Sequence, residues 1–467
     1  MRDIPRAGLR PCRALGGEAM KSAIVVGGGI SGLSTTYYLT KAGVPVTLID
    51  PGERLGGVMR TERVQGCVIE AGPDSFISAK PWALDLIREL GLEDEVIGSN
   101  DHLRKTYIQR RRQLVPMPDG LQLMVPTRVL PMVTTDLLGW RTKIRMGLEL
   151  FHRPRESAHG DRSVSQFLCE HYGREAVDYL AEPLLAGVYG GDPDRLSAES
   201  VLPRFVELEA KYGSLTKGVL RARGPASKQP LFRTMRDGFG SLAGALERAI
   251  EGKATIVRGA VDALERTPVG WRARCRDSWI EAGHAVLACR AYEAGALVSG
   301  RLAELLQGIP YNASMTLALG YKRAGFKHPL NGFGFLCPKL ERGRVVACTW
   351  VGTKFAHRVP DDMVLLRCFL GGGSMGDGDE VIVAAVREEL RAIMGVTEEP
   401  AFSRIFRWPR SMAQYEVGHG GRIAEIEALL KPLDGLLLAG NAYYGIGVPD
   451  CVRMGKQAAD RVAARNG

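Results

Sequence analysis

A glycine cluster near the amino terminus constrains the fold of this chain more than any other feature. An apolar run over residues 23–26 leads into a turn and then into a helical pattern that ends near Gly43. The turn contains six residues: Gly27, Gly28, Gly29, Ile30, Ser31 and Gly32. Gly27 permits the tight turn, Gly29 lets the backbone approach a pyrophosphate, and Gly32 lets helix and strand pack closely.

A second apolar run completes this pattern. Residues 46–49 are followed by Asp50, about 20 residues beyond the turn. At this position dinucleotide-binding folds have an acidic residue that binds the adenosine ribose. Each part alone is a weak signal. Strand, turn, helix, strand and acid in this order predict a Rossmann-like dinucleotide-binding domain.

Two further glycine-rich segments predict more contacts with a nucleotide. Directly after Asp50, paired glycines with flanking arginines suit a second close approach to the pyrophosphate, with an ordinary turn as the alternative. Near the carboxyl terminus, the loop 440–451 precedes a helix whose first amides can face an electron-rich ligand atom, with a structural turn as the alternative. The expected cofactor contacts in these segments are Pro51, Arg54, Gly56, Gly57 and Gly440.

Several segments resemble a known family of flavoenzymes. Residues 54–61 resemble the amine-oxidase and phytoene-desaturase branch of FAD enzymes, which implies FAD and not NAD. Other segments resemble the porphyrinogen oxidases of that superfamily, which include bacterial coproporphyrinogen III and protoporphyrinogen IX oxidases. These segments are 70–76, 182–192, 347–350, 407–419 and 445–451. The chain departs from the family pattern in its amino-terminal extension and at Ala413, where the family commonly has proline.

The resemblance implies a set of cofactor and substrate contacts. Lys80 stands where the family places a cation that binds a substrate propionate, with a solvated surface lysine as the alternative. No catalytic side chain and no metal are expected, because the flavin carries the chemistry. The further contacts implied for noncovalent FAD are Gly72, Pro73, Asp74, Ser75, Val261, Trp408, Gly447, Val448 and Pro449.

The resemblance also implies the reaction. A porphyrinogen loses six electrons to become a porphyrin in haem biosynthesis, with O2 as acceptor and H2O2 as product. We expect coproporphyrinogen III as substrate, because the chain is basic and this compound carries four carboxylates. Protoporphyrinogen IX, with two carboxylates, is the alternative. An amine oxidase, a carotenoid desaturase and a noncatalytic flavin or porphyrin carrier are more distant alternatives.

Separated patterns along the chain predict a discontinuous domain. The expected fold is α/β plus α+β, with a Rossmann-like FAD-binding domain built from residues 20–81, 230–296 and 409–467. Apolar periodicity predicts a helical domain over 82–203. Strand-like runs predict a sheet-based substrate domain over 297–408.

Two stretches are expected to lie outside these domains. Residues 204–229 contain glycine, proline and serine and are expected to form a connector. Residues 1–19 lack the long apolar core of a secretory signal, so we expect a disordered extension, with a targeting peptide as the alternative. A chain that begins at Met20 is therefore expected to fold and work.

The composition narrows the location and the partners of the protein. Hydrophobic residues make up 45% of the chain and charged residues 24%, so no transmembrane helix is expected. Nine scattered cysteines indicate neither a disulfide framework nor a zinc site and favour the cytoplasm. The net charge of +10 includes basic clusters over 104–112 and 141–155, which fit either solvated faces or peripheral contact with anionic lipids. The sequence contains no nucleic-acid-binding motif and leaves the oligomeric state open.

Overall fold

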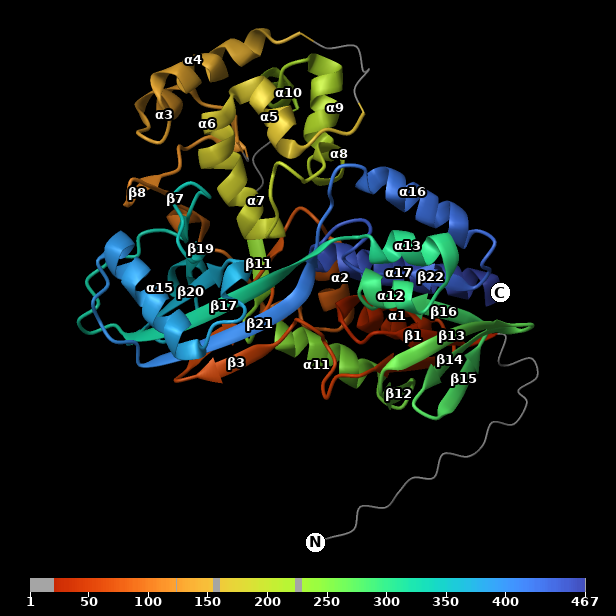
Figure 1. The fold of residues 1–467 in the computed structure, drawn as a ribbon. Coiled ribbons are helices and arrows are strands. Elements are labelled where there is room, and N and C mark those ends of the chain that lie inside the picture. Colours follow the sequence, from red (N-terminus) through yellow and green to blue (C-terminus); the bar gives the residue numbers. More distant parts are fainter. Residues whose placement is uncertain (1–20, 123, 154–159, 223–228, 467) are drawn as a thin grey trace.

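The computed structural model describes residues 21–122, 124–153, 160–222 and 229–466 (Figure 1). The extension expected over 1–19 lies outside these residues, as does part of the expected connector. The described chain forms two main sheets, with a group of helices beyond the region where the sheets meet (Figure 1).

A five-stranded parallel sheet contains the first glycine turn. Its strands, in spatial order, are β12 (Thr255–Arg258), β2 (Val46–Asp50), β1 (Ala23–Val26), β16 (His284–Leu287) and β22 (Leu436–Leu438). Every residue of β1 and β16 is buried, as is typical of central parallel strands, which read as continuous apolar runs. The strands come from distant parts of the chain, which confirms the discontinuous Rossmann-like fold class.

Helices and a second small sheet cover the parallel sheet. The helices are α1 (Ile30–Lys41), α2 (Trp82–Glu89), α11 (Phe239–Ile250) and α17 (Val448–Asn466). The small antiparallel sheet consists of β13 (Val261–Thr267), β14 (Gly270–Cys275) and β15 (Ser278–Ala282), and it contacts β1 and β16. Helices α1 and α17 pack so closely that a Cβ at Gly455 would lie 2.5 Å from the carbonyl oxygen of Ser31. The amino-terminal ends of both helices therefore lie near the same edge of the parallel sheet.

A seven-stranded sheet forms the second half of the molecule. Its strands, in spatial order, are β21 (Phe402–Ala413), β17 (Tyr311–Lys322), β20 (Met363–Leu370), β19 (Val345–Trp350), β18 (Gly334–Leu336), β7 (Thr106–Arg110) and β8 (Gln113–Pro116). Helix α15 (Asp379–Met394) packs Ile382, Val386 and Leu390 into one apolar core with the sheet residues Leu317 and Leu366. All neighbouring strands are antiparallel except β7 and β18.

Two expected boundaries differ from this arrangement. The region expected to be helical, 82–203, contains strands over 96–126, and two of them join the seven-stranded sheet. Strand β7 is parallel to β18, so Ile108 pairs with Leu336 and is fully buried. It also forms a hairpin with β8, but the turn residues Arg111 and Arg112 are not the Asn or Gly that mark such a turn in a sequence. Strand β21 also continues to Ala413, beyond the expected domain end at 408.

Ten further helices of the described chain gather in one group between residues 129 and 221 (Figure 1). They are α3 (Val129–Thr134), α4 (Trp140–Leu148), η4 (Glu149–Phe151), α5 (Val164–Tyr172), α6 (Arg174–Ala176), the π-helix η5 (Val177–Ala181), α7 (Glu182–Tyr189), α8 (Ala198–Val201), α9 (Pro203–Tyr212) and α10 (Leu215–Arg221). Ser163 caps α5 by accepting a hydrogen bond from the amide of Gln166, whose side chain bonds back to Ser163. Helix α7 runs from this group toward the two sheets (Figure 1).

Short elements complete the fold. They are β3 (Thr61–Val64), β4 (Cys67–Glu70), β5 (Phe76–Ile77), β6 (Val96–Gly98), β9 (Leu121–Gln122), β10 (Val125–Pro126), β11 (Phe232–Met235), η2 (Glu93–Glu95), η3 (Asp101–Leu103), α12 (Ala291–Ala296), α13 (Gly300–Gln307), α14 (Val351–Lys354), η6 (Gly372–Ser374) and α16 (His419–Leu430). Among the described residues, no helix has the length and apolar character needed to cross a bilayer.

Candidate active site

A large cavity lies where the two sheets and α7 meet. Its volume is about 1940 Å³. The cavity wall includes the carboxyl end of the parallel sheet, the segment 71–76, strand β17 and the loop 440–451. Pockets for one small ligand hold roughly 300–1,000 Å³, so this cavity has room for a dinucleotide and a second large ligand.

The first glycine turn has the geometry that its sequence predicts. Gly27 has a φ of +105°, and a Cβ there would lie 2.8 Å from the amide nitrogen of Cys289. A Cβ at Gly32 would lie 1.8 Å from the carbonyl oxygen of Gly27, so helix and strand leave no room for a side chain. Gly29 lines the cavity and has open space at its Cβ position, which suits the approach of a phosphate group to the start of α1.

Asp50 joins the first two glycine segments. One carboxylate oxygen accepts a 2.6 Å hydrogen bond from the amide of Gly28, and the other accepts a 2.8 Å bond from the amide of Gly52. A carboxylate has about four lone-pair positions, so Asp50 retains acceptor capacity toward the cavity that it lines. The Asp50 carboxylate can therefore still accept hydrogen bonds from a ribose.

The second glycine segment folds back on the first. The amide of Gly56 donates to the carbonyl oxygen of Gly28 at 2.7 Å. The Arg54 guanidinium donates to the carbonyl oxygens of Leu55 and Met59 at 3.1 Å each and to that of Gly57 at 2.5 Å. Arg54 therefore shapes the loop backbone around the cavity.

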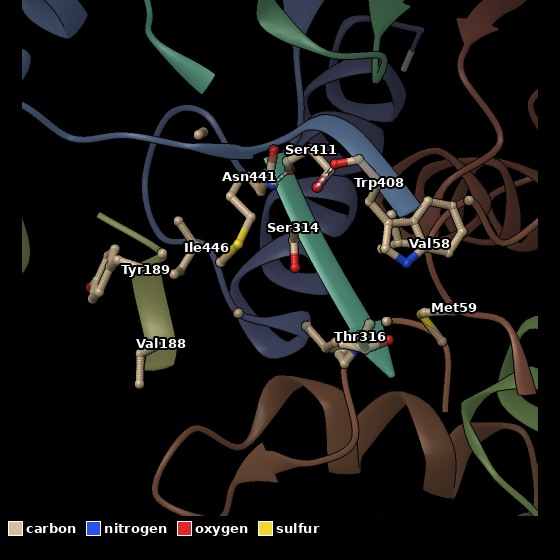
Figure 2. A pocket seen from close by; sticks show the side chains of 18 of the residues that line it. Val58, Met59, Val188, Tyr189, Ser314, Thr316, Trp408, Ser411, Asn441 and Ile446 are labelled. Atoms are coloured by element: carbon tan, nitrogen blue, oxygen red, sulfur yellow. Dashed lines mark hydrogen bonds between the residues drawn. The ribbon is translucent and has the colours of Figure 1, made fainter. Parts of the chain in front are cut away.

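Buried polar side chains clamp the segment that follows β4. Trp408 on β21 donates its indole N–H to the carbonyl oxygen of Ala71 at 2.8 Å, and the hydroxyl of Thr316 on β17 donates to the same oxygen at 3.2 Å. Arg367 on β20, 3% exposed, donates to the carbonyl oxygens of Glu70 and Gly72. Figure 2 shows Trp408, Thr316, Val58 and Met59 around this part of the cavity.

Asp74 carries a charge within this clamped segment. Its carboxylate lies 2.9 Å from the ammonium of Lys354. Burial alone would raise the pKa of Asp74, but the charges of Lys354 and Arg367 hold it well below its usual range. Asp74 is therefore ionised and paired across the two halves of the molecule.

The carboxyl-terminal loop is fixed by tyrosine and by the start of α17. The Tyr415 hydroxyl donates to the carbonyl oxygen of Asn441 at 2.9 Å and accepts from the amide of Gly445 at 2.7 Å. Gly447, Val448 and Pro449 line the cavity where α17 begins. The first amides of a helix have no partners within the helix and carry partial positive charge, so this end suits an electron-rich ligand atom.

Lys80 lies in the cavity wall and is already paired. Its ammonium lies 2.6 Å from a carboxylate oxygen of Asp450. The Lys80 side chain is 43% exposed, and that of Asp450 is 5% exposed. The lysine thus faces the cavity while its charge is balanced by a buried carboxylate from the first turn of α17.

Most residues expected to bind a cofactor line this cavity together. Two of them lie behind its wall: Gly28, whose amide binds Asp50, and Gly32, which packs against Gly27. The cavity residues among those expected are Gly27, Gly29, Ile30, Ser31, Asp50, Pro51, Arg54, Gly56, Gly57, Gly72, Pro73, Asp74, Ser75, Val261, Trp408, Gly440, Gly447, Val448 and Pro449.

Several charged residues of the cavity wall were not predicted from the sequence. They include Asp450, Lys354, Arg367 and Lys339. A signal existed only for Arg367, because an arginine within the apolar run 363–370 indicates a buried partner. Among the described residues, no group of His, Cys, Asp and Glu side chains is arranged to hold a metal ion.

The parallel sheet, its glycine turns and the shared cavity define a dinucleotide-binding oxidoreductase fold with a separate substrate sheet. Residues 30–463 match the family described as flavin containing amine oxidoreductase. The chain therefore belongs to this family of flavin enzymes, and its relatives place it among the porphyrinogen oxidases.

Three relatives illustrate the similarity. Coproporphyrinogen III oxidase of Bacillus subtilis (strain 168) is 31% identical, with 94% of this chain and 97% of the relative covered. Coproporphyrinogen III oxidase of Staphylococcus aureus (strain NCTC 8325 / PS 47) is 30% identical, with 95% and 99% covered. The crystal structure of a putative protoporphyrinogen oxidase from Exiguobacterium sp. 255-15 has a TM-score of 0.86 and 31% identity, with 95% and 99% covered.

Proposed function

We propose that this protein oxidises coproporphyrinogen III to coproporphyrin III in haem biosynthesis, with FAD as cofactor, O2 as electron acceptor and H2O2 as product. The observation that carries the proposal is the similarity to curated coproporphyrinogen III oxidases over nearly the whole of both chains. The cavity supports it, because it has room for a macrocycle beside a dinucleotide and has cationic side chains in its wall. Protoporphyrinogen IX is the alternative substrate, because one solved relative carries the name of a putative protoporphyrinogen oxidase.

The residues of the cavity fit FAD as a noncovalent cofactor. The open space at Gly29, the acceptor capacity of Asp50 and the start of α17 suit the pyrophosphate, the ribose and the flavin ring, respectively. Burial raises the pKa of Cys289 to about 12 and that of Cys451 to about 11. These cavity thiols are therefore protonated at neutral pH and are poor nucleophiles for covalent attachment of a flavin.

Acid precipitation of the purified protein tests the noncovalent cofactor. The flavin should be released into a yellow supernatant and identified as FAD by chromatography. The variant Asp50→Ala should bind FAD about 10-fold to 100-fold more weakly, because it removes charged hydrogen-bond acceptors at the nucleotide. A yellow pellet, or undiminished FAD affinity in this variant, would count against the proposal.

The chain's own residues would bind and orient the substrate. FAD, when bound, would supply the acceptor for each two-electron oxidation, with O2 as the final oxidant. Figure 2 shows Val188 and Tyr189 of α7 on one side of the cavity, across from Trp408 and Val58. An apolar slot of this kind holds a macrocycle in one orientation, and orientation alone removes much of the barrier to hydride transfer. Lys80 is proposed to hold a carboxylate at the cavity wall.

Anaerobic mixing separates this activity from its alternatives. Coproporphyrinogen III should bleach the flavin of the purified protein in the absence of O2, whereas putrescine should leave its spectrum unchanged. Bleaching by the amine alone would indicate an amine oxidase. Tight porphyrin binding without bleaching would indicate a carrier.

An exposed apolar surface supports peripheral contact with a membrane. In α4, Trp140, Ile144 and Leu148 follow one helical stripe, and each is at least 60% exposed. Arg141 and Lys143 flank the stripe, and the Lys143 ammonium lies 4.7 Å from the centre of the Trp140 ring. Apolar side chains bordered by cations suit the boundary between acyl chains and anionic headgroups. We propose a cytoplasmic protein that binds such a membrane through α4.

Sedimentation with vesicles tests the membrane contact. The protein should sediment with vesicles of phosphatidylcholine and phosphatidylglycerol and should remain free with phosphatidylcholine alone. Ile144→Asp should reduce the bound fraction. Val381→Asp is the matched control, because Val381 is 56% exposed on α15, far from α4 in the fold (Figure 1). Equal binding of both variants would contradict this surface.

A further inference from the structure

The cations of the cavity wall differ in how firmly each is held. Lys354 is 11% exposed and Arg367 is 3% exposed, and both are used by carboxylate or carbonyl oxygens within the protein. Arg342 is 19% exposed and binds Glu182, which is 9% exposed. These three cations are committed to partners within the protein and hold the fold together.

Lys339 differs from this group. Its side chain is 61% exposed and lines the cavity. Its ammonium has a 2.7 Å hydrogen bond to a carboxylate oxygen of Asp192, which is 34% exposed. An ammonium has three donors, so Lys339 can bind a further acceptor while it retains this one. An ion pair as exposed as this contributes little free energy, so another carboxylate can replace Asp192 at small cost.

Hydrogen bonds fix the backbone around Lys339, so its side chain moves while its Cα atom stays in place. The amide of Lys339 donates to Glu182 at 2.8 Å, and Glu341 accepts from the hydroxyl of Tyr179 at 3.0 Å. Both contacts fasten the connection between β18 and β19 to the helices η5 and α7. A flexible lysine side chain on a rigid backbone segment is well placed to bind an anion at the rim of the cavity.

Asp192 is also held in place. Its second carboxylate oxygen accepts a 3.1 Å hydrogen bond from the amide of Asp194. The preceding end of α7 is tied to the seven-stranded sheet, because the Asn312 side chain donates to the carbonyl oxygen of Gly190 at 2.6 Å. Asp192 therefore stays at the rim when its lysine moves away.

We propose that Lys339 is a second carboxylate-binding residue of the cavity, which exchanges Asp192 for a carboxylate of the substrate. The inference rests on the proposed function, which supplies a substrate with several carboxylates. Lys80 and Lys339 come from different halves of the fold, so together they recognise two separate carboxylates of one macrocycle. Asp192 competes with the substrate and keeps the lysine extended at the rim of the empty cavity.

Binding of coproporphyrin III to the flavin-loaded protein tests this assignment, measured by porphyrin fluorescence anisotropy. Lys339→Gln should raise the Kd about 2-fold to 5-fold, because one carboxylate loses its cation. Asp192→Asn should lower the Kd about 2-fold to 5-fold, because it removes the competing anion. Lys322→Gln is the matched control. Its ammonium also pairs with an aspartate, Asp362 at 3.3 Å, but does not line the cavity.

Opposite effects of the two variants on the Kd distinguish a lysine that binds the substrate from one that has only a structural role. A structural ion pair would predict weaker binding in both variants, and this result would overturn the inference. Unchanged binding in both would overturn it as well, while the proposed function would stand. Failure of the wild-type protein to bind coproporphyrin III would overturn the proposed substrate and, with it, the role of Lys339.

Discussion

The ion pair of Lys80 and Asp450 allows a prediction that separates substrate binding from stability. Lys80→Met removes the cation and leaves Asp450, 5% exposed, without its 2.6 Å partner. Loss of one member of a fully buried pair costs about 3–5 kcal/mol. Because Lys80 is 43% exposed and water can reach its position, we expect a smaller cost, about 1–3 kcal/mol. In a chain of this length each kcal/mol shifts Tm by roughly 1 °C, so Tm should fall by about 1–3 °C.

The double variant Lys80→Met/Asp450→Asn sharpens this test. It removes both charges, so most of the lost stability should return. If Lys80 binds a substrate carboxylate directly, KM for coproporphyrinogen III should remain about 3-fold to 100-fold higher than in the wild type. The change in kcat should be smaller, because the contact is equally strong in substrate and transition state.

Thermal unfolding and steady-state kinetics on the wild type and these two variants decide between the roles. Recovery of Tm with a persistent rise in KM supports a direct contact between Lys80 and the substrate. Recovery of both would show that Lys80 acts only through the loop that contains Asp450. An unchanged Tm and KM in Lys80→Met would refute the reasoning altogether.

Further variants test the nucleotide turn and the helical region. Gly29→Ala should fold normally but bind FAD more weakly, because its Cβ would project into the open cavity. Gly32→Ala should lower Tm in the cofactor-free protein, because its Cβ would lie 1.8 Å from a carbonyl oxygen. Equal losses of Tm in the two variants would contradict this reasoning. Burial lowers the pKa of His171, but hydrogen bonds to Glu149 and Glu209 outweigh it and raise the pKa. The stabilisation from protonated His171 is therefore complete below about pH 6.5 and is lost as pH rises through the raised pKa. Tm should fall over this range in the wild type and fall less in His171→Gln. Identical pH profiles of Tm in the two proteins would contradict this direction.

Local sequence patterns predicted the nucleotide-binding part of the fold. The strand, turn and helix over 23–41 lie within a short stretch, and each glycine there has a steric reason that the sequence already contains. Strand β7 was missed because the turn to its hairpin partner β8 consists of Arg111 and Arg112 instead of the usual Asn or Gly, and because its other partner, β18, lies more than 200 residues later in the chain. Its place in a sheet depends on that distant edge more than on its own residues.

The same limit applies to the candidate site. Lys80 was found by resemblance, but its partner Asp450 is 370 residues away, and no local pattern connects the two. Lys339 was missed because an exposed lysine in a turn has no distinctive sequence signal. Its neighbour Asp192 was noted only as part of a motif. Charged contacts between domains could therefore be identified only from the structure, whereas the glycine turns could be predicted from the sequence.

The preference for coproporphyrinogen III is tested most directly by a comparison of two substrates. Steady-state rates with coproporphyrinogen III and protoporphyrinogen IX should be measured in air, with porphyrin fluorescence and O2 consumption recorded together. We predict a higher kcat/KM for coproporphyrinogen III, with one H2O2 formed for every two electrons removed. A higher kcat/KM for protoporphyrinogen IX, or porphyrin binding without O2 consumption, would contradict the account.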